Sequence, residues 1–301
     1  MTDIATPGLR LAHRLSQLTF GATLLLILAG GLVTNTGAAL AVPDWPTTFG
    51  YNMFLYPWAQ MVGGVFFEHS HRLLGSVVGM LTLALAASLW PAGGRWRVLG
   101  LVATAAVITQ GVLGGLRVVL LQPTLAILHG CLAQAFLALV VVIMLLTAPR
   151  PASASARDVD PTLRTLAFLA VALVYLQLVF GAFLTHAGWI ELHLVTALAV
   201  YVLVPVVAAR VARWGGGRAV SGLLHAMLGV QLALGIASFL VRFTSIGMPG
   251  GTTTSLAMPV AHRVVGSIIL AATIALAVRT ATANRGRAGA VGRPIVSQAA
   301  S

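Results

Sequence analysis

The chain has 301 residues, of which 58% are hydrophobic and 8% are charged, and its mean hydropathy is +0.96. A soluble domain of this size needs more polar surface, so the composition excludes a soluble globular protein and predicts a membrane protein. The net charge is +12, and all 18 basic residues are arginine. Their distribution follows membrane topology, so no nucleic-acid partner is expected.

Eight apolar runs are long enough to cross the hydrocarbon core of a lipid bilayer, which takes about 20 residues. Such spans must be helical, because lipid offers no partner for free backbone polar groups. The sequence therefore predicts an all-α membrane protein with eight transmembrane helices. The runs cover residues 17–38, 66–89, 98–119, 124–147, 164–184, 190–211, 220–241 and 257–279.

The arginines predict the topology. The loops 39–65 and 185–189 contain none, whereas the two termini and the even-to-odd connections hold fourteen. By the positive-inside rule, both termini are expected to be cytoplasmic. We expect a multi-pass protein of the bacterial inner (plasma) membrane that keeps its first span uncleaved. The fourteen are Arg10, Arg14, Arg95, Arg97, Arg150, Arg157, Arg164, Arg210, Arg213, Arg218, Arg279, Arg285, Arg287 and Arg293.

The loop 39–65 combines the motif Pro43–Asp44–Trp45–Pro46 with further aromatic residues that suit a membrane interface. It is long enough to cover a site as a lid. The strongest local signal follows it, at the outer end of the second span, in Glu68–His69–Ser70–His71–Arg72.

Glu68 and His71 are three residues apart and therefore share a helix face, while His69 points roughly the opposite way. Ionisable side chains inside a membrane are costly and are usually kept for function, so we expect Glu68 and His71 to take part in chemistry. The alternative is that Glu68 pairs with Arg72 one turn later and anchors the end of the helix.

One histidine lies near the start of each even-numbered span: His71, His129, His193 and His262. If the chain threads the membrane back and forth, the four imidazoles fall at similar depth, toward the same face. Two pairs of inward-facing imidazoles are what two bis-histidine haem sites require. The His71–Arg72 pair is repeated as His262–Arg263, whereas His193 has a weaker local motif.

Four arginines lie in or near the outer ends of spans, where none is expected from topology: Arg72, Arg117, Arg242 and Arg263. A cation beside a ligand imidazole can bind a haem propionate. The alternative is that these side chains extend to lipid headgroups.

The remaining histidines and the single cysteine are assigned no chemistry. His13 and His225 lie at the cytoplasmic side, and His186 lies in a short outer loop. His69 is the substitute ligand if the helix phase shifts by one residue. Cys131 is expected to be a buried, inert thiol, and as the only cysteine it excludes an internal disulfide.

The two halves of the chain resemble each other. A glutamine precedes a glycine by four residues in Gln110–Gly114, Gln177–Gly181 and Gln231–Gly235, which places both on one helix face for packing or ligand contact. We therefore expect two pseudo-repeated four-helix bundles. The expected parts are bundles at 1–148 and 164–280, a cytoplasmic linker at 149–163 and a cytoplasmic tail at 281–301.

Thr36–Gly37, the Pro43–Asp44–Trp45–Pro46 loop, Glu68–x–x–His71–Arg72 and the later histidines together resemble the haem A synthase family over residues 20–280. The resemblance implies oxidation of the C8 methyl group of haem O to a formyl group, giving haem A for terminal oxidases. It implies haem O as substrate, a haem O synthase upstream and haem b as cofactor. The oligomeric state is left open, with a homo-oligomer as one expectation.

The resemblance also implies different roles for the two sites, with Glu68 assisting catalysis. The substrate haem is expected in the N-terminal half and haem b in the C-terminal half. The substrate-haem residues are then His71, His129, Arg72 and Arg117, and the haem b residues are His193, His262, Arg242 and Arg263.

One departure concerns the outer loop. Many bacterial members of the family carry a cysteine pair flanking this loop motif, where the present chain has Val42 and Thr48. A disulfide role in electron or haem transfer is therefore excluded here. Two alternative functions stay open: a di-haem electron carrier of the b type, and a transporter or assembly factor whose histidines handle protons or metal.

Overall fold

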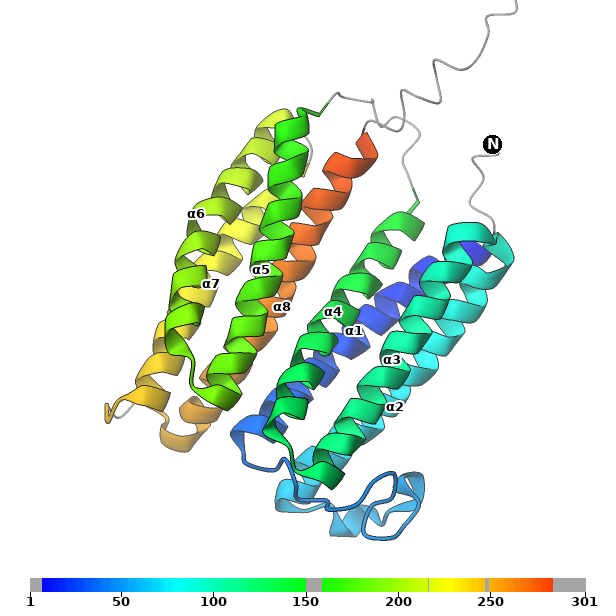
Figure 1. Ribbon diagram of the computed structural model, residues 1–301, viewed down its shortest axis with the longest axis vertical. Coiled ribbons are helices and arrows are strands. Elements are labelled where there is room, and N and C mark those ends of the chain that lie inside the picture. Colours follow the sequence, from blue (N-terminus) through cyan, green and yellow to red (C-terminus); the bar gives the residue numbers. More distant parts are fainter. Residues whose placement is uncertain (1–6, 150–158, 216, 247–248, 284–301) are drawn as a thin grey trace, which may run out of the picture.

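A computed structural model describes residues 7–149, 159–215, 217–246 and 249–283. Most of the predicted linker and tail, including Arg150, Arg157 and the arginines after residue 283, falls outside these ranges. Within them the chain forms eight long α-helices (Figure 1). Their bounds are α1 Pro7–Asn35, α2 Gly63–Leu89, α3 Gly94–Leu120, α4 Pro123–Thr147, α5 Pro161–Ala187, α6 Ile190–Trp214, α7 Arg218–Phe243 and α8 Gly251–Ala283.

All eight helices are long and apolar enough to cross a membrane. This confirms the prediction of an all-α, multi-pass membrane protein. Large apolar side chains such as Leu18, Met80 and Leu198 are exposed on the outer helix surfaces. Such exposure suits helices that have lipid rather than water as their solvent.

The helices extend beyond the predicted spans, because hydropathy selects only their apolar middle parts. α1 begins at Pro7 rather than at residue 17, and α5 begins at Pro161, where the Asp160 side chain caps Thr162 N at 2.9 Å. α8 begins at Gly251, six residues before the predicted span. The connection left between the predicted spans 220–241 and 257–279 is therefore shorter in the structure.

The helices pack as two rings of four. α1 contacts α2 and α4, and α3 contacts the same two helices; α5 contacts α6 and α8, and α7 contacts the same two. Contacts of α1 with α8, α4 with α5 and α4 with α8 join the rings (Figure 1). The interpretation of the two halves as a sequence repeat stays a prediction.

The start of α1, the end of α4, the start of α5 and the end of α8 lie together at one end of the molecule (Figure 1). The loop 36–62 lies at the opposite end, which we call the loop end. This loop contains two short 3-10 helices, η1 Met53–Leu55 and η2 Trp58–Gln60. A third, η3 Trp90–Ala92, joins α2 to α3.

The largest buried core follows α8, which contacts α1, α4, α5, α6 and α7. Leu270, Ile274 and Leu276 of α8 pack there with buried residues of α5, α6 and α7. The four predicted ligand histidines are in the parts of α2, α4, α6 and α8 nearer the loop end. The apolar core therefore holds the helices in place while the histidines lie between the core and the loop.

Candidate haem sites

His71 of α2 and His129 of α4 face each other inside the first ring of helices. Their ring centroids are 6.5 Å apart and the ring planes are inclined by 70°. The Nδ1 atom of each ring is buried without a hydrogen-bond partner. An unpaired polar atom in an apolar interior is unfavourable, which indicates that a ligand belongs between these rings.

His193 of α6 and His262 of α8 form an equivalent pair in the second ring of helices. Their centroids are 6.3 Å apart, the planes are inclined by 66°, and His262 Nδ1 is buried without a partner. The structure therefore brings together both histidine pairs that the sequence indicated.

The two pairs differ in their contacts with glutamine. Gln177 Nε2 lies 3.2 Å from each ring nitrogen of His193, and its carbonyl accepts a hydrogen bond from Thr196. Gln231 Nε2 lies 3.3 Å from His262 Nε2. In the first pair, Gln110 instead donates to the backbone carbonyl of His129 at 3.0 Å. Amide contacts with the ring nitrogens are thus found only in the second pair.

The separation of the rings fits ligation of a haem iron. An imidazole nitrogen lies about 2 Å from a metal that it binds, so two imidazoles on opposite sides of one iron have centroids roughly 6 Å apart. Among the residues with known placement, no group of three or more His, Cys, Asp or Glu could hold a metal. Each pair thus supplies two ligands only, and a porphyrin would supply the others.

Glu68 and Arg72 contact the outer loop and form the buried ion pair that the sequence left as an alternative. The Arg72 guanidinium lies 2.9 Å from Glu68 Oε1, and it also donates to the carbonyls of Val42, Asp44 and Thr47 at 2.7–3.0 Å. Glu68 Oε2 accepts from Val42 N at 3.0 Å. Both side chains therefore hold the loop against α2.

His69 also contacts the loop rather than the first histidine pair. Its Nδ1 lies 3.1 Å from the Thr48 hydroxyl, and its ring centroid lies 5.1 Å from that of Tyr56. Val42 and Thr48, which stand where the family resemblance led us to expect cysteines, are fully buried. Side chains of α2 thus hold this loop through noncovalent contacts.

The Pro43–Asp44–Trp45–Pro46 motif reaches across to α3. The peptide bond between Trp45 and Pro46 is cis, and the Trp45 indole lies directly against Gly115. The loop is therefore anchored to both α2 and α3 at the loop end (Figure 1). A role of this loop as a lid over the first site stays a prediction.

The remaining predicted arginines gather at the loop end. Arg117 of α3 is within electrostatic range of His71, His129 and Glu68, and Arg263 of α8 is within range of Arg117. In the described part of the chain, neither arginine makes a side-chain hydrogen bond or ion pair to protein. This excess of positive charge suits carboxylate groups of a ligand.

Arg242 and His186 complete this positive region. Arg242 Nη2 donates to the carbonyl of Thr185 at 3.2 Å, and both Arg242 and His186 interact electrostatically with Arg263. The sequence assigned Arg242 to haem binding and gave His186 no role. The structure brings the two side chains into the same electrostatic environment.

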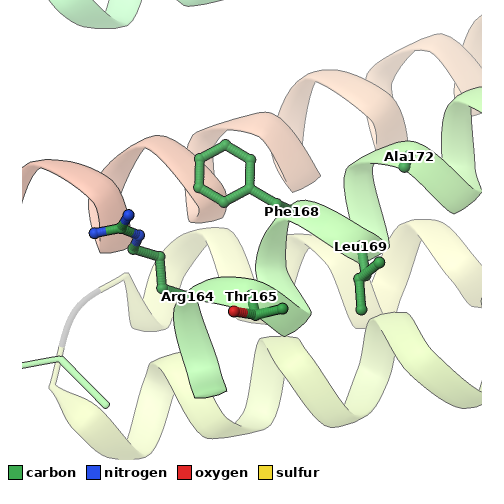
Figure 2. A pocket seen from close by; sticks show the side chains of 5 residues that line it. All are labelled: Arg164, Thr165, Phe168, Leu169 and Ala172. Carbon is green, nitrogen blue, oxygen red and sulfur yellow. The ribbon is translucent and has the colours of Figure 1, made fainter. Parts of the chain in front are cut away.

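A surface hollow on α5 lies away from both histidine pairs. All of its lining residues belong to the first part of α5 (Figure 2), which lies at the end opposite the loop end (Figure 1). It offers one cation and otherwise apolar or hydroxyl groups, so it provides no chemistry related to the histidines. The lining residues are Arg164, Thr165, Phe168, Leu169 and Ala172.

Comparison with known families gives a match over part of the chain. The COX15-CtaA family, described as cytochrome oxidase assembly protein, matches residues 13–190, which is more than half of the chain. The chain belongs to this family. The COX15-CtaA match includes His71 and His129, while His193 and His262 lie beyond it.

Two curated relatives are named haem A synthase. The protein of Shouchella clausii is 35% identical over 116 residues, which are 37% of each chain. The protein of Alkalihalophilus pseudofirmus is 28% identical over 178 residues, which are 57% of this chain and 59% of the relative. The chain therefore matches less than two thirds of the length of either relative.

Gly30 of α1 is a site residue that the sequence did not indicate. An added Cβ at Gly30 would lie 3.0 Å from Cε1 of His71. In α3, α5 and α7 a glutamine stands four residues before the glycine that contacts a histidine. In α1 the residue four positions before Gly30 is Leu26. The pattern that marks the other three glycines is therefore missing in α1.

Proposed function

We propose that this protein is a haem A synthase, which oxidises the C8 methyl group of haem O to a formyl group and so provides haem A for terminal oxidases. The observation that carries the proposal is the presence of two histidine pairs, one inside each ring of helices, with ring centroids 6.5 and 6.3 Å apart. The names of the two relatives support the same activity.

The proposal assigns haem O to His71 and His129 and a haem b cofactor to His193 and His262. A substrate must enter and leave, and the loop 36–62 is the segment held beside the first pair. A cofactor must stay bound. The amide nitrogens of Gln177 and Gln231 give the second pair polar neighbours that the rings of the first pair lack, so the two sites are not equivalent. When bound, haem b supplies one-electron redox chemistry.

Positive side chains at the loop end would hold the propionates of the two haems. Arg117 and Arg263 support this role, because both lack a protein partner in the described ranges. Arg72 contributes less to propionate binding in this proposal, since it already donates hydrogen bonds to three loop carbonyls and Glu68.

Glu68 assists the reaction in this proposal. Glu68 is 4% exposed, and its carboxylate binds Arg72 and the backbone N–H of Val42. It lies one helical turn before His71, so it both holds the loop and supplies a carboxylate beside the substrate haem. These two contributions are separated by comparing the Gln and Ala variants.

The proposal includes a bacterial inner membrane location with both termini in the cytoplasm, as the arginine distribution predicts. Haem O is apolar and would reach the first site from the bilayer, supplied by a haem O synthase. Assembly of copies into a homo-oligomer is compatible with the many exposed apolar side chains on the helices.

The pigment bound to the purified protein tests this function. Wild-type protein supplied with haem O should yield formyl-haem by mass spectrometry. Glu68→Ala should yield roughly 100-fold less, the usual effect of losing a group that transfers protons, and Glu68→Gln should show the same loss with the loop retained. Glu191→Ala, an exposed carboxylate at the same end, is the matched control. Full conversion by Glu68→Ala would contradict its assigned role.

A second function has one observation in its favour. The two histidine pairs have nearly the same separation and inclination, which suits two haems held permanently in one electron carrier. Such a carrier would retain two low-spin b haems and would leave haem O unchanged. The same mass spectra and optical spectra separate the two functions.

A further inference from the structure

Each of the four ligand histidines lies against a glycine of the preceding helix. At these glycines, the space where a Cβ would stand is closest to Cε1 of an imidazole ring. The distances from the added Cβ to Cε1 are 3.0 Å for Gly30 and His71, 3.2 Å for Gly114 and His129, 3.5 Å for Gly181 and His193, and 3.1 Å for Gly235 and His262.

These distances divide the glycines into two groups. Non-bonded carbon atoms prefer separations of about 3.5–4.0 Å. A methyl group at Gly181 would therefore fit, whereas one at Gly30, Gly114 or Gly235 would press on the ring. The ring would then have to shift by a few tenths of an ångström.

The contacts of the Nδ1 atoms divide in the same way, while Nε2 of His262 lies 3.3 Å from the Gln231 amide nitrogen. The Nδ1 atoms of His71, His129 and His262 are buried without a partner, and these are the three rings that lie tightly on glycine. His193, which lies less tightly on Gly181, contacts the Gln177 amide through both ring nitrogens. A ring whose Nδ1 has no partner depends more on packing against the neighbouring helix for its orientation.

We infer that Gly30, Gly114 and Gly235 are positioning residues that set the orientation of the ligand imidazoles through direct backbone contact. The inference rests on the proposed haem-binding function and goes beyond it. It assigns three rings to packing against glycine and the fourth, His193, to hydrogen bonding with Gln177.

The second site offers the sharpest test, with haem b as the probe and the full-length protein purified in detergent. Gly235→Ala should lose the low-spin signal of the second haem in electron paramagnetic resonance. Gly229→Ala, on the same helix with nothing within 4 Å of an added Cβ, should keep that signal. Gly181→Ala should lose less of it than Gly235→Ala. Equal signals from Gly235→Ala and Gly229→Ala would overturn the inference.

The first site repeats the comparison with haem O as the probe. Gly30→Ala and Gly114→Ala should each weaken low-spin binding. Their controls are Gly21→Ala in α1 and Gly111→Ala in α3, where an added Cβ also meets nothing within 4 Å. Controls as damaging as the test variants would refute the assignment to ring contact.

A measurement without haem keeps the inference testable if a variant folds poorly. Gly235→Ala should lower the thermal unfolding temperature of haem-free protein, and this loss should disappear in the His262→Ala background, where the ring is absent. A loss that persists without the ring would overturn the inference. If wild-type protein binds no haem, the proposed function fails, while this cycle still decides whether glycine positions the ring.

Discussion

Asp44 organises the outer loop through one carboxylate. It accepts hydrogen bonds from the Thr47 hydroxyl at 2.5 Å, Phe49 N at 2.7 Å and Gly50 N at 2.8 Å. Phe49 has a φ of 50°, a left-handed conformation that is unfavourable for a residue with a side chain, and the carboxylate holds this turn. The sequence singled out the motif that contains Asp44 but did not reveal this internal cap.

The loop should lose stability in acid because of Asp44. Partial burial raises the pKa of this carboxyl, but hydrogen bonds from Gly50, Thr47 and Phe49 outweigh burial, so the pKa lies below its ordinary value of 3.8. A lowered folded-state pKa contributes stability above 3.8, and that contribution is lost as the pH falls through the folded pKa.

Pepsin cleavage of the loop 36–62 between about pH 5 and pH 2 measures this effect. Cleavage of wild-type protein should accelerate toward the lower pH. Asp44→Asn should be cleaved faster at the higher pH and should show a weaker pH dependence. Asp160→Asn, at the start of α5 and far from the loop, is the control. An unchanged pH profile in Asp44→Asn would contradict the prediction.

The ligand histidines could be predicted from sequence, whereas the contacts of Arg72 could not. Four histidines at corresponding places in alternating apolar spans are a local and periodic signal. The Arg72 side chain binds backbone carbonyls about thirty residues earlier, in a loop whose path depends on the whole fold. Backbone acceptors leave no residue type for a sequence pattern to reveal.

At the scale of elements, α3 supports the loop through Gly115. An alanine Cβ there would overlap the rigid indole of Trp45, which cannot yield as the end of a flexible side chain would. Gly115→Ala should therefore displace the loop from α3 and destabilise the protein by about 1–3 kcal/mol, as overpacking usually does.

Thermal unfolding in detergent and protease sensitivity of the loop measure the effect of Gly115→Ala. Gly111→Ala, one helical turn earlier with open space at its Cβ, is the matched control. The loop of Gly115→Ala should be cleaved faster than that of Gly111→Ala. Equal rates would show that Trp45 does not depend on the contact with α3.

The existence of all eight helices could be predicted because lipid permits only helical spans of sufficient apolar length. The start of α8 could not, since Gly251 and the following threonines and serine are polar and continue the helix outside the apolar run. Hydropathy reports where a helix meets lipid, and backbone hydrogen bonding decides where it begins.

At the scale of the whole molecule, a buried hydrogen bond joins the two rings of helices. Ser267 of α8 donates to Oε1 of Gln134 in α4 at 3.0 Å, and both side chains are buried. Tyr175 of α5 also donates to the Cys131 carbonyl of α4 at 3.2 Å. These polar contacts hold the two rings in one register, and apolar packing alone would specify that register less well.

Removing one partner of the hydrogen bond between Ser267 and Gln134 should destabilise the protein more than removing both partners. Ser267→Ala leaves the Gln134 carbonyl buried without its donor, which costs about 1–3 kcal/mol. The double variant Gln134→Leu/Ser267→Ala should recover part of this loss, because no unpaired polar atom remains. A double-mutant cycle of unfolding free energies measures the coupling. Additive losses would show that the bond does not link the rings.

The way in which Glu68, His69 and Arg72 hold the outer loop has a practical consequence. Every tie between the loop and α2 or α3 is a hydrogen bond, an ion pair or a packing contact, and the sole sulfhydryl, at Cys131, lies in α4. The loop 36–62 therefore contains no disulfide for dithiothreitol to reduce and no thiol for an alkylating reagent to modify. The loop should therefore keep its shape under both oxidising and reducing conditions, and acid rather than reductant should open it.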